Sequence, residues 1–186
     1  MRSDYINTNV LSHILWAMTP ADRLISEIAL QTGWRIDDIL ELETESIKHA
    51  LELKRPALTI TEKKTGKRSR KQLPRRLLQE CLQQAGRFYV FEGRDDWRKH
   101  RTRQAVFLDL KRVAKKFKIK CNFSPYSLRK NYAVYMRENF GFEAAQKALN
   151  HTNPNVTFIY AFSDLDEMKS AKKRKRATGK QKKSRN

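Results

Sequence analysis

The sequence lacks several features that mark common protein classes. Its only two cysteines, Cys81 and Cys121, form no Cys-x-x-Cys pair, so we expect reduced structural thiols and neither a disulfide framework nor a zinc site. No apolar run approaches the roughly 18 residues that a membrane span needs, and the N-terminus carries no secretory signal. The six glycines form no phosphate-binding loop. These absences predict a soluble protein of the cell interior.

Acidic residues are also scarce, 20 against 40 basic ones in 186 residues, which gives a formal net charge of +20. An excess of this size and single sign indicates a polyanionic partner, such as nucleic acid or an acidic membrane surface. Residues 169–186 hold ten basic and no acidic side chains and show no apolar periodicity. We expect them to form a disordered basic tail, either solvated or bound to phosphates, behind one folded domain at 1–168.

Hydrophobic spacing predicts a mainly helical fold with one small antiparallel sheet (α+β). Pro20 at the start and Gly33 at the end bound one helix, and a short helix over 34–42 follows directly. Residues 57–61 and 68–73 predict two strands of a hairpin around a basic Thr-Gly turn. The remaining helices are expected at 74–86, 102–118, 124–138 and 142–149, and from residue 154.

Four short segments carry residues suited to phosphate chemistry. They are ALQTGWRIDDIL at 29–40, EKKTGK at 62–67, SPYSLRK at 124–130 and ALNHTNPNVTFIY at 148–160. In this order they resemble the first arginine box, the catalytic-lysine hairpin, the second arginine box and the nucleophile box of the tyrosine recombinase (phage integrase) family. The resemblance covers about residues 19–165 and implies the catalytic-domain fold of that family.

The resemblance implies that DNA is cleaved and rejoined through a 3′-phosphotyrosyl intermediate. Tyr160 would be the nucleophile, and its phenol needs help in losing a proton because its ordinary pKa is about 10. Arg35 and Arg129 would bind the phosphate, since two permanently charged guanidiniums stabilise the negative charge that grows in the transition state. His151 would donate a hydrogen bond to the phosphate, and Lys64 would protonate the departing 5′ oxygen.

Some assignments within these boxes stay open. Lys63 and Lys67 flank Lys64 in the sequence and could replace it as the general acid. Asp38 matches an acidic position that supports the site. Tyr126 stands where the family commonly has histidine. A phenol can donate a hydrogen bond to a phosphate, but it accepts protons poorly near neutral pH, which weakens the expectation of a fast enzyme.

The resemblance also implies the partners. These are double-stranded DNA and further copies of the chain in a tetramer on recombination sites, with no metal, other cofactor or membrane. It implies a cytoplasmic, nucleoid-associated protein of prokaryotic, phage or mobile-element origin. DNA contacts are expected from basic side chains of the hairpin and of the helix at 102–118, namely Lys63, Lys67, Arg68, Arg70, Lys71, Lys111 and Lys115.

Length separates this chain from most of the family. Only about 18 residues precede the match, so we expect no N-terminal DNA-clamping domain. The chain is similar in size to the small fimbrial phase-variation invertases. A site-specific recombinase or integrase is the main hypothesis. The alternatives are a degenerate recombinase that occupies DNA without efficient cutting, which Tyr126 and the missing clamp favour, and a type IB topoisomerase-like enzyme that relaxes DNA.

Overall fold

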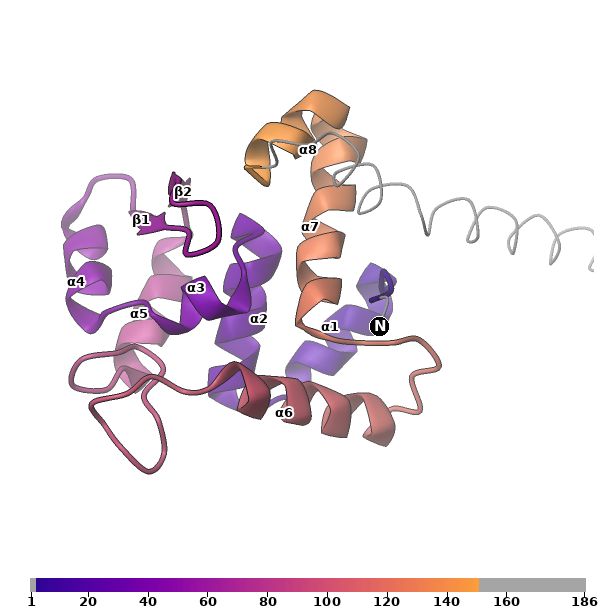
Figure 1. The fold of residues 1–186 in the computed structure, drawn as a ribbon, viewed down its shortest axis with the longest axis horizontal. Coiled ribbons are helices and arrows are strands. Elements are labelled where there is room, and N and C mark those ends of the chain that lie inside the picture. Colours follow the sequence, from indigo (N-terminus) through magenta and orange to yellow (C-terminus); the bar gives the residue numbers. More distant parts are fainter. Residues whose placement is uncertain (1–2, 151–186) are drawn as a thin grey trace, which may run out of the picture.

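The structure is a computed structural model that describes residues 3–150 (Figure 1). The expected mainly helical fold with one two-stranded antiparallel sheet is confirmed. The helix expected from residue 154 and the basic tail at 169–186 lie outside the described residues. The elements in chain order are α1 (Thr8–Trp16), α2 (Pro20–Thr32), α3 (Ile36–Leu40), α4 (Thr44–Glu52), β1 (Ala57–Thr61), β2 (Arg68–Gln72), α5 (Arg75–Gln84), α6 (Arg103–Lys116), α7 (Pro125–Phe140) and α8 (Phe142–Ala148).

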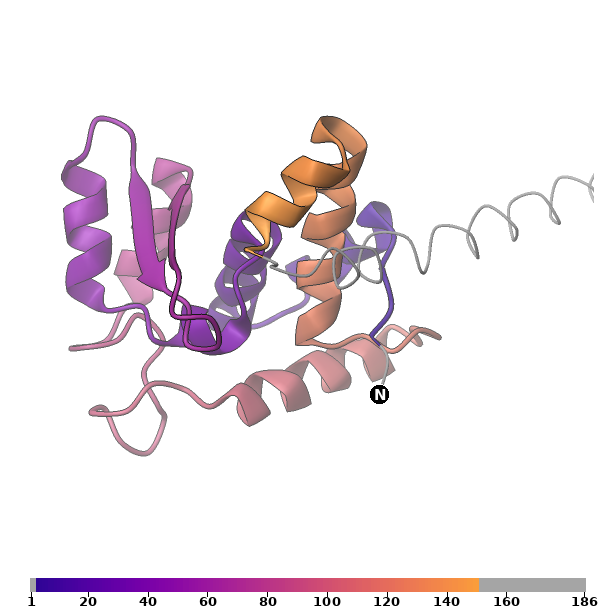
Figure 2. The ribbon, with the colours of Figure 1, turned by 45° about the horizontal axis from the view of Figure 1, so that its top comes forward.

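Helix α2 is the centre of the fold. The hydroxyl of Thr19 accepts a hydrogen bond from the backbone N–H of Asp22, and Pro20 occupies the first turn, so the helix begins where the sequence predicts. Gly33 ends it in the left-handed region, with a φ of 69°. Ile25 and Ile28 on α2 are fully buried. Five helices pack directly against α2, namely α1, α3, α5, α6 and α7. Helix α6 runs beneath α2 and the start of α7 in Figures 1 and 2.

The hairpin is attached to the helical core through Trp34. Strands β1 and β2 pair with Thr59 opposite Arg70, as in a simple antiparallel ladder. The buried indole of Trp34, just after α2, donates a hydrogen bond from Nε1 to Oγ of Ser69 on β2 at 2.9 Å. Because side chains alternate along a strand, Ser69 faces the core while Arg68 and Arg70 are exposed.

Two helices were not expected from the sequence. Helix α4 lies between the helix expected to end at 42 and the strand expected from 57, where no element was predicted. Its buried side chains, Thr44, Ile47 and Ala50, include only one large apolar residue. Helix α1 precedes the family resemblance at 19–165, in a segment for which no element was predicted, yet Leu11 and Ile14 bury their side chains in the core. Both helices are therefore held by tertiary packing that local periodicity signals only weakly.

The helix expected over 34–42 is shorter at both ends and spans Ile36–Leu40. Arg35 has an extended backbone, with φ −73° and ψ 148°, and is the N-cap of α3. The preceding Trp34 leaves the helical path because its side chain inserts into the core. Helix α7 continues past the expected end at 138 to Phe140, because Gly141 at φ 88° is the residue that ends it.

The two cysteines form no disulfide in the part of the chain that the structure describes, as expected. Cys81 lies on α5 within the core, where burial, with smaller effects of Glu27 and Glu80, raises the pKa of its thiol to about 12. None of the helices between residues 3 and 150 is both long and apolar enough to cross a membrane.

Candidate active site

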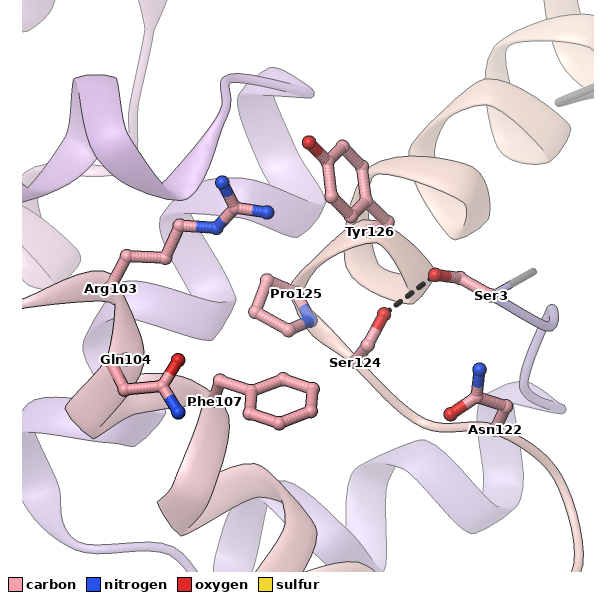
Figure 3. A pocket seen from close by; sticks show the side chains of 8 residues that line it. All are labelled: Ser3, Arg103, Gln104, Phe107, Asn122, Ser124, Pro125 and Tyr126. Atoms are coloured by element: carbon pink, nitrogen blue, oxygen red, sulfur yellow. Dashed lines mark hydrogen bonds between the residues drawn. The ribbon is translucent and has the colours of Figure 1, made fainter. Parts of the chain in front are cut away.

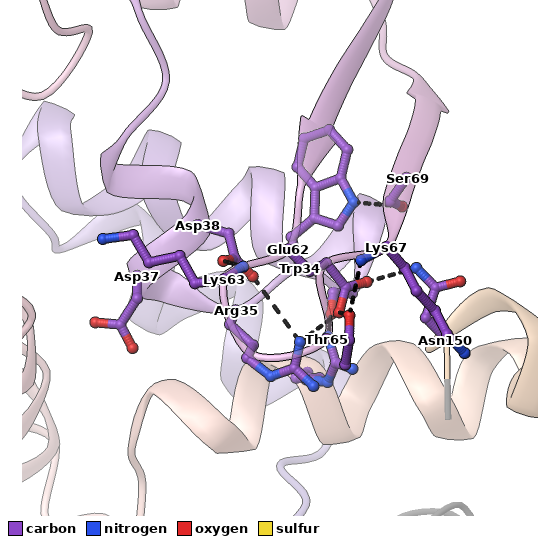
Figure 4. Close-up of polar contacts among 12 residues, drawn as sticks. Trp34, Arg35, Asp37, Asp38, Glu62, Lys63, Thr65, Lys67, Ser69 and Asn150 are labelled. Atoms are coloured by element: carbon purple, nitrogen blue, oxygen red, sulfur yellow. Dashed lines mark hydrogen bonds and ion pairs between the residues drawn. The ribbon is translucent and has the colours of Figure 1, made fainter. Parts of the chain in front are cut away.

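Arg35 lies at the tight junction between α2 and α3 that the sequence predicts. Its side chain is 17% exposed, and its Nη1 donates to Oε2 of Glu62 at 2.5 Å. The same nitrogen lies 4.0 Å from Oδ2 of Asp38, three residues along α3. Figure 4 shows the Arg35 guanidinium reaching toward these two carboxylates, which come from the hairpin turn and from α3. Nη1 of Arg35 is thus held by two buried carboxylates of the protein.

Glu62 joins three segments at this point. Its side chain is 2% exposed. Besides Arg35, it accepts a hydrogen bond at Oε1 from Nδ2 of Asn150 at 2.5 Å, and one at Oε2 from the hydroxyl of Thr65 at 3.2 Å. Burial acts to raise the pKa of the Glu62 carboxyl, but the hydrogen bond from Asn150 and the pairing with Arg35 hold it below its ordinary value. Glu62 is therefore a buried anion with strong partners.

Asp38 holds the hairpin turn against α3. Its Oδ1 accepts a hydrogen bond from the backbone N–H of Lys63 at 3.1 Å. Its Oδ2 is buried and accepts no hydrogen bond from any described residue. Burial raises the pKa of the Asp38 carboxyl, and the Lys63 N–H and Arg35 partly oppose that rise. This position suits the supporting role expected for Asp38.

Arg129 on α7 reaches the same region from the other side. It is 3% exposed. Its Nη1 donates to the carbonyl oxygen of Gly33, and its Nη2 donates to that of Leu149 at 2.8 Å. Burial acts to raise the pKa values of the Asp38 and Glu62 carboxyls, and the charges of Arg35 and Arg129 both act against that effect. The charges of two arginines from distant parts of the chain therefore act on the same two buried carboxylates.

Tyr126 stands beside the two arginines. Arg35, Tyr126 and Arg129 line one hollow, together with Trp34, Asp37, Arg103 and Pro125. The Tyr126 ring is 40% exposed, and the guanidinium carbon of Arg103 on α6 lies 5.1 Å from its centroid. Figure 3 shows these two side chains among those that line a neighbouring pocket of about 510 Å³. The phenol is thus placed where it can meet a group held by the arginines.

The basic side chains predicted to contact DNA lie in different settings. Lys64 and Lys67 are exposed in the hairpin turn, and Lys115 is exposed on α6. Lys63 pairs with Glu41. The ammonium of Lys111 donates to Oδ1 of Asn122 at 2.6 Å. Arg68 and Arg70 on β2 are exposed as well, so most of the exposed members lie on the hairpin.

Lys71, also predicted as a DNA contact, is partly buried between β2 and the end of α8. Its ammonium donates to the hydroxyl of Tyr132 at 3.2 Å and to the carbonyl oxygen of Ala148 at 3.1 Å. Burial lowers the pKa of Lys71, Arg129 lowers it further, and Glu62 opposes both. Lys71 and Arg129 thus bind neighbouring carbonyls at the end of α8.

Three residues of this site were not among the sequence-predicted catalytic groups. They are Glu62, Lys71 and Asn150. Glu62 directly precedes the basic turn and Asn150 directly precedes His151, so their places in the boxes were the available signal. His151 and Tyr160 themselves lie outside the described residues. No cluster of His, Cys, Asp and Glu that could hold a metal ion is found among residues 3–150.

Comparison with known proteins agrees with this architecture. A "Tyrosine recombinase" of Thermosipho africanus (strain TCF52B) is 26% identical over 183 residues, which cover 91% of this chain and 61% of the relative. The crystal structure of XerA recombinase superposes with a TM-score of 0.70 at 16% identity, covering 92% of this chain and 65% of that one. A lambda integrase tetramer bound to a Holliday junction gives a TM-score of 0.70 at 18% identity, covering 87% and 48%.

These comparisons fix the fold and the family. The chain spans about three fifths of the length of the curated relative that it matches. The structural neighbours share the fold at low identity. The sequence profile of the phage integrase family matches residues 5–167, which include α1 and all four boxes. The chain therefore belongs to the phage integrase family.

Proposed function

We propose that this chain cuts and rejoins DNA as the catalytic part of a site-specific recombinase or integrase. The observation that carries the proposal is the convergence of Arg35, Tyr126 and Arg129 on one hollow. Family membership and the order of the four boxes support the same chemistry. The catalytic domain would span residues 1–168, with 169–186 as a basic tail that adds nonspecific contacts to DNA phosphates.

The two arginines would bind the phosphate that is attacked. A pentavalent phosphoryl centre gains negative charge on its nonbridging oxygens, so donors that are already in place stabilise it more than the ground state. The Arg129 guanidinium is held by the carbonyls of Gly33 and Leu149, and Nη1 of Arg35 is held by Glu62. Little reorganisation would then be needed when the charge develops. The hydroxyl of Tyr126 would donate a further hydrogen bond to the phosphate.

The covalent step would use Tyr160. Its phenol gives up a proton to solvent as the oxygen attacks phosphorus, the bond from phosphorus to the 5′ oxygen breaks, and the 3′ phosphate stays on the tyrosine. Lys64 would give a proton to the departing 5′ oxygen, and His151 would donate a hydrogen bond to the phosphate. The phosphotyrosyl bond retains the energy of the phosphodiester. Attack by a 5′ hydroxyl of another strand therefore rejoins the DNA and restores the tyrosine.

The DNA partner and the assembly are proposed from the same comparisons. XerH recombinase has been solved bound to its difH substrate, and lambda integrase as a tetramer on a Holliday junction. We infer double-stranded DNA and a tetramer for this chain as well, in a cytoplasmic, nucleoid-associated setting. The exposed basic residues of the hairpin and α6 would contact the phosphates of the duplex.

The cutting reaction can be tested without knowing the target sequence. A nicked duplex library with randomised arms should trap a covalent protein–DNA adduct, because the short strand beyond the nick dissociates after cleavage and prevents rejoining. We expect an adduct with the native chain and none with Tyr160→Phe. Arg35→Ala and Arg129→Ala should each lower its rate by about 10²–10³-fold, as for loss of one transition-state donor. An adduct that survives Tyr160→Phe would contradict the proposed nucleophile.

The presence of Tyr126 favours a second candidate, a recombinase that binds DNA without efficient cutting. The same library distinguishes the two, since this candidate retards the DNA in a native gel but leaves no adduct in a denaturing gel. Tyr126→His should then raise adduct formation. A topoisomerase-like activity would instead relax a supercoiled plasmid without exchanging strands between two duplexes.

The exposed basic residues of the hairpin have their own test. Arg68→Gln with Arg70→Gln removes two exposed charges from one face of β2. If both contact phosphates, the slope of log affinity against log salt should become shallower by about 2, at roughly 0.9 per contact. Lys48→Gln with Arg76→Gln removes the same charge from the surface of α4 and α5 and should leave most of the slope intact. Equal changes in the two double variants would place the DNA elsewhere.

A further inference from the structure

The buried carboxylate of Glu62 makes contacts beyond those that form the hairpin turn. One oxygen faces Arg35 and the other faces Asn150, at 2.5 Å each (Figure 4). Its backbone also closes the hairpin turn, because its carbonyl accepts from the N–H of Gly66 at 2.8 Å and its N–H donates to the carbonyl of Lys67 at 2.9 Å. The same residue therefore shapes the turn and fixes an arginine outside it.

The direction of the contact with Arg35 decides what Glu62 can do. Among the described residues, the polar contacts of the Arg35 guanidinium are made through Nη1, toward Glu62 and Asp38. Both of these carboxylates are 2% exposed. Arg35 also lines the open hollow with Tyr126 and Arg129. The carboxylates thus lie on the inner side of the guanidinium, which leaves Nε and Nη2 for a group that enters the hollow.

We propose that Glu62 is a positioning residue, which fixes Nη1 of Arg35 and thereby presents the rest of the guanidinium to the phosphate. The proposal rests on the proposed function, because it assigns Glu62 to the same reaction. An arginine has five N–H donors in one plane, so fixing one end of the fork sets the direction of the others. An unanchored Arg35 would have to be ordered at each turnover, and part of its transition-state stabilisation would be lost.

Glu62 extends this anchoring to the nucleophile box. Asn150 is the last described residue before His151, and its amide is bound by Glu62. The carbonyls of Ala148 and Leu149 are bound by Lys71 and Arg129. The start of the nucleophile box is therefore tied to β2, to α7 and, through Glu62, to the turn that carries Lys64. Of the contacts that Glu62 makes, the ion pair with Arg35 is the one that a charge-removing variant of Glu62 breaks most directly.

A double-mutant cycle tests whether Glu62 acts through Arg35. Single-turnover cleavage of the nicked library at saturating protein is compared for the native chain, Glu62→Gln, Arg35→Ala and the double variant. We expect Glu62→Gln to slow cleavage about 10–100-fold, because it keeps the shape but not the charge that anchors Arg35. In the Arg35→Ala background it should change the rate less than about threefold. Equal factors in the two backgrounds would overturn the proposal.

A neighbouring carboxylate provides the matched control. Glu41 pairs with Lys63 of the same turn but makes no contact with Arg35 in the described structure. Glu41→Gln removes the same charge and should cleave at close to the native rate. DNA affinity is the readout that a structural defect would move: Glu62→Gln should bind uncut DNA at least as well as the native chain, since it removes a negative charge near the phosphate. Weaker binding in step with slower cleavage would overturn the proposal.

The remaining outcomes are also decisive. Glu62→Asp keeps the charge on a shorter side chain and should cleave at a rate between those of the native chain and Glu62→Gln, which gives a second reading if the Gln variant folds poorly. Faster cleavage by Glu62→Gln would mean that the carboxylate competes with phosphate for Arg35, contrary to the proposal. If the native chain forms no adduct, the proposed function itself fails. If it forms one and Glu62→Gln matches it, only the role of Glu62 fails.

Discussion

Gly33 provides a quantitative test of how the site is built. Its φ of 69° is strained for residues with a Cβ, and a Cβ at this position would lie 2.2 Å from Cδ1 of Tyr132 and 3.1 Å from Cδ2 of Leu149. The left-handed backbone costs an alanine about 1–2 kcal/mol, and overpacking costs about 1–3 kcal/mol more. We therefore expect Gly33→Ala to lower the free energy of unfolding by about 2–5 kcal/mol.

Gly66 is the matched control for this change. Its φ is 65°, close to that of Gly33, but a Cβ there would meet nothing within 4 Å. Gly66→Ala should therefore cost only the backbone strain, about 1–2 kcal/mol. Urea unfolding followed by circular dichroism measures both variants. Gly33→Ala should lower the free energy of unfolding by about 1–3 kcal/mol more than Gly66→Ala, and this difference measures how closely Tyr132 packs against the end of α2. Equal destabilisation of the two variants would refute that packing.

Three other features give separate predictions. Burial and the Arg129 guanidinium lower the pKa of Lys71, so above that lowered pKa the unfolded chain binds more protons than the folded chain. Raising the pH from about 7 toward 10 should therefore stabilise the native chain relative to Lys71→Met. A difference in the free energy of urea unfolding that stays constant with pH would contradict this. Burial raises the pKa of the Cys81 thiol to about 12, so a thiol reagent should modify Cys121 in the folded chain and reach Cys81 only in denaturant, whereas labelling of Cys81 in the folded chain would count against its burial. Trp34→Phe removes the hydrogen bond to Ser69 and should cost about 1–2 kcal/mol, with a smaller added cost when Ser69→Ala is already present; additive costs would show that the bond contributes nothing.

Local signals predicted the elements that place Arg35. Pro20 and Gly33 bound α2 because one fits the first helical turn and the other adopts the left-handed backbone at the end. Helix α4 escaped prediction because Ile47 is its only large buried apolar side chain. Its helical state depends on α5 and β1, which pack against it, and no local pattern contains that information.

The two arginines of the site could be predicted from the sequence, but the contacts of Lys71 could not, because they depend on tertiary packing. Arg35 and Arg129 could be chosen from their boxes, and the structure places both at one hollow. Lys71 lies in a basic run and therefore looked like another DNA contact. The strand period of two puts it on the inward side with Ser69, between the exposed Arg70 and Gln72. That it binds the Ala148 carbonyl depends on where α8 ends relative to β2, which the sequence of β2 does not encode.

Tyr160 is the residue proposed to form the covalent bond to DNA. The adduct from the nicked library can be digested with nuclease and trypsin and analysed by mass spectrometry. Cleavage after Lys147 and Lys169 releases a peptide in which Tyr160 is the only tyrosine. We expect the residual nucleotide on this peptide and at Tyr160. A nucleotide on the peptide that contains Tyr126, or on any other residue, would contradict the account.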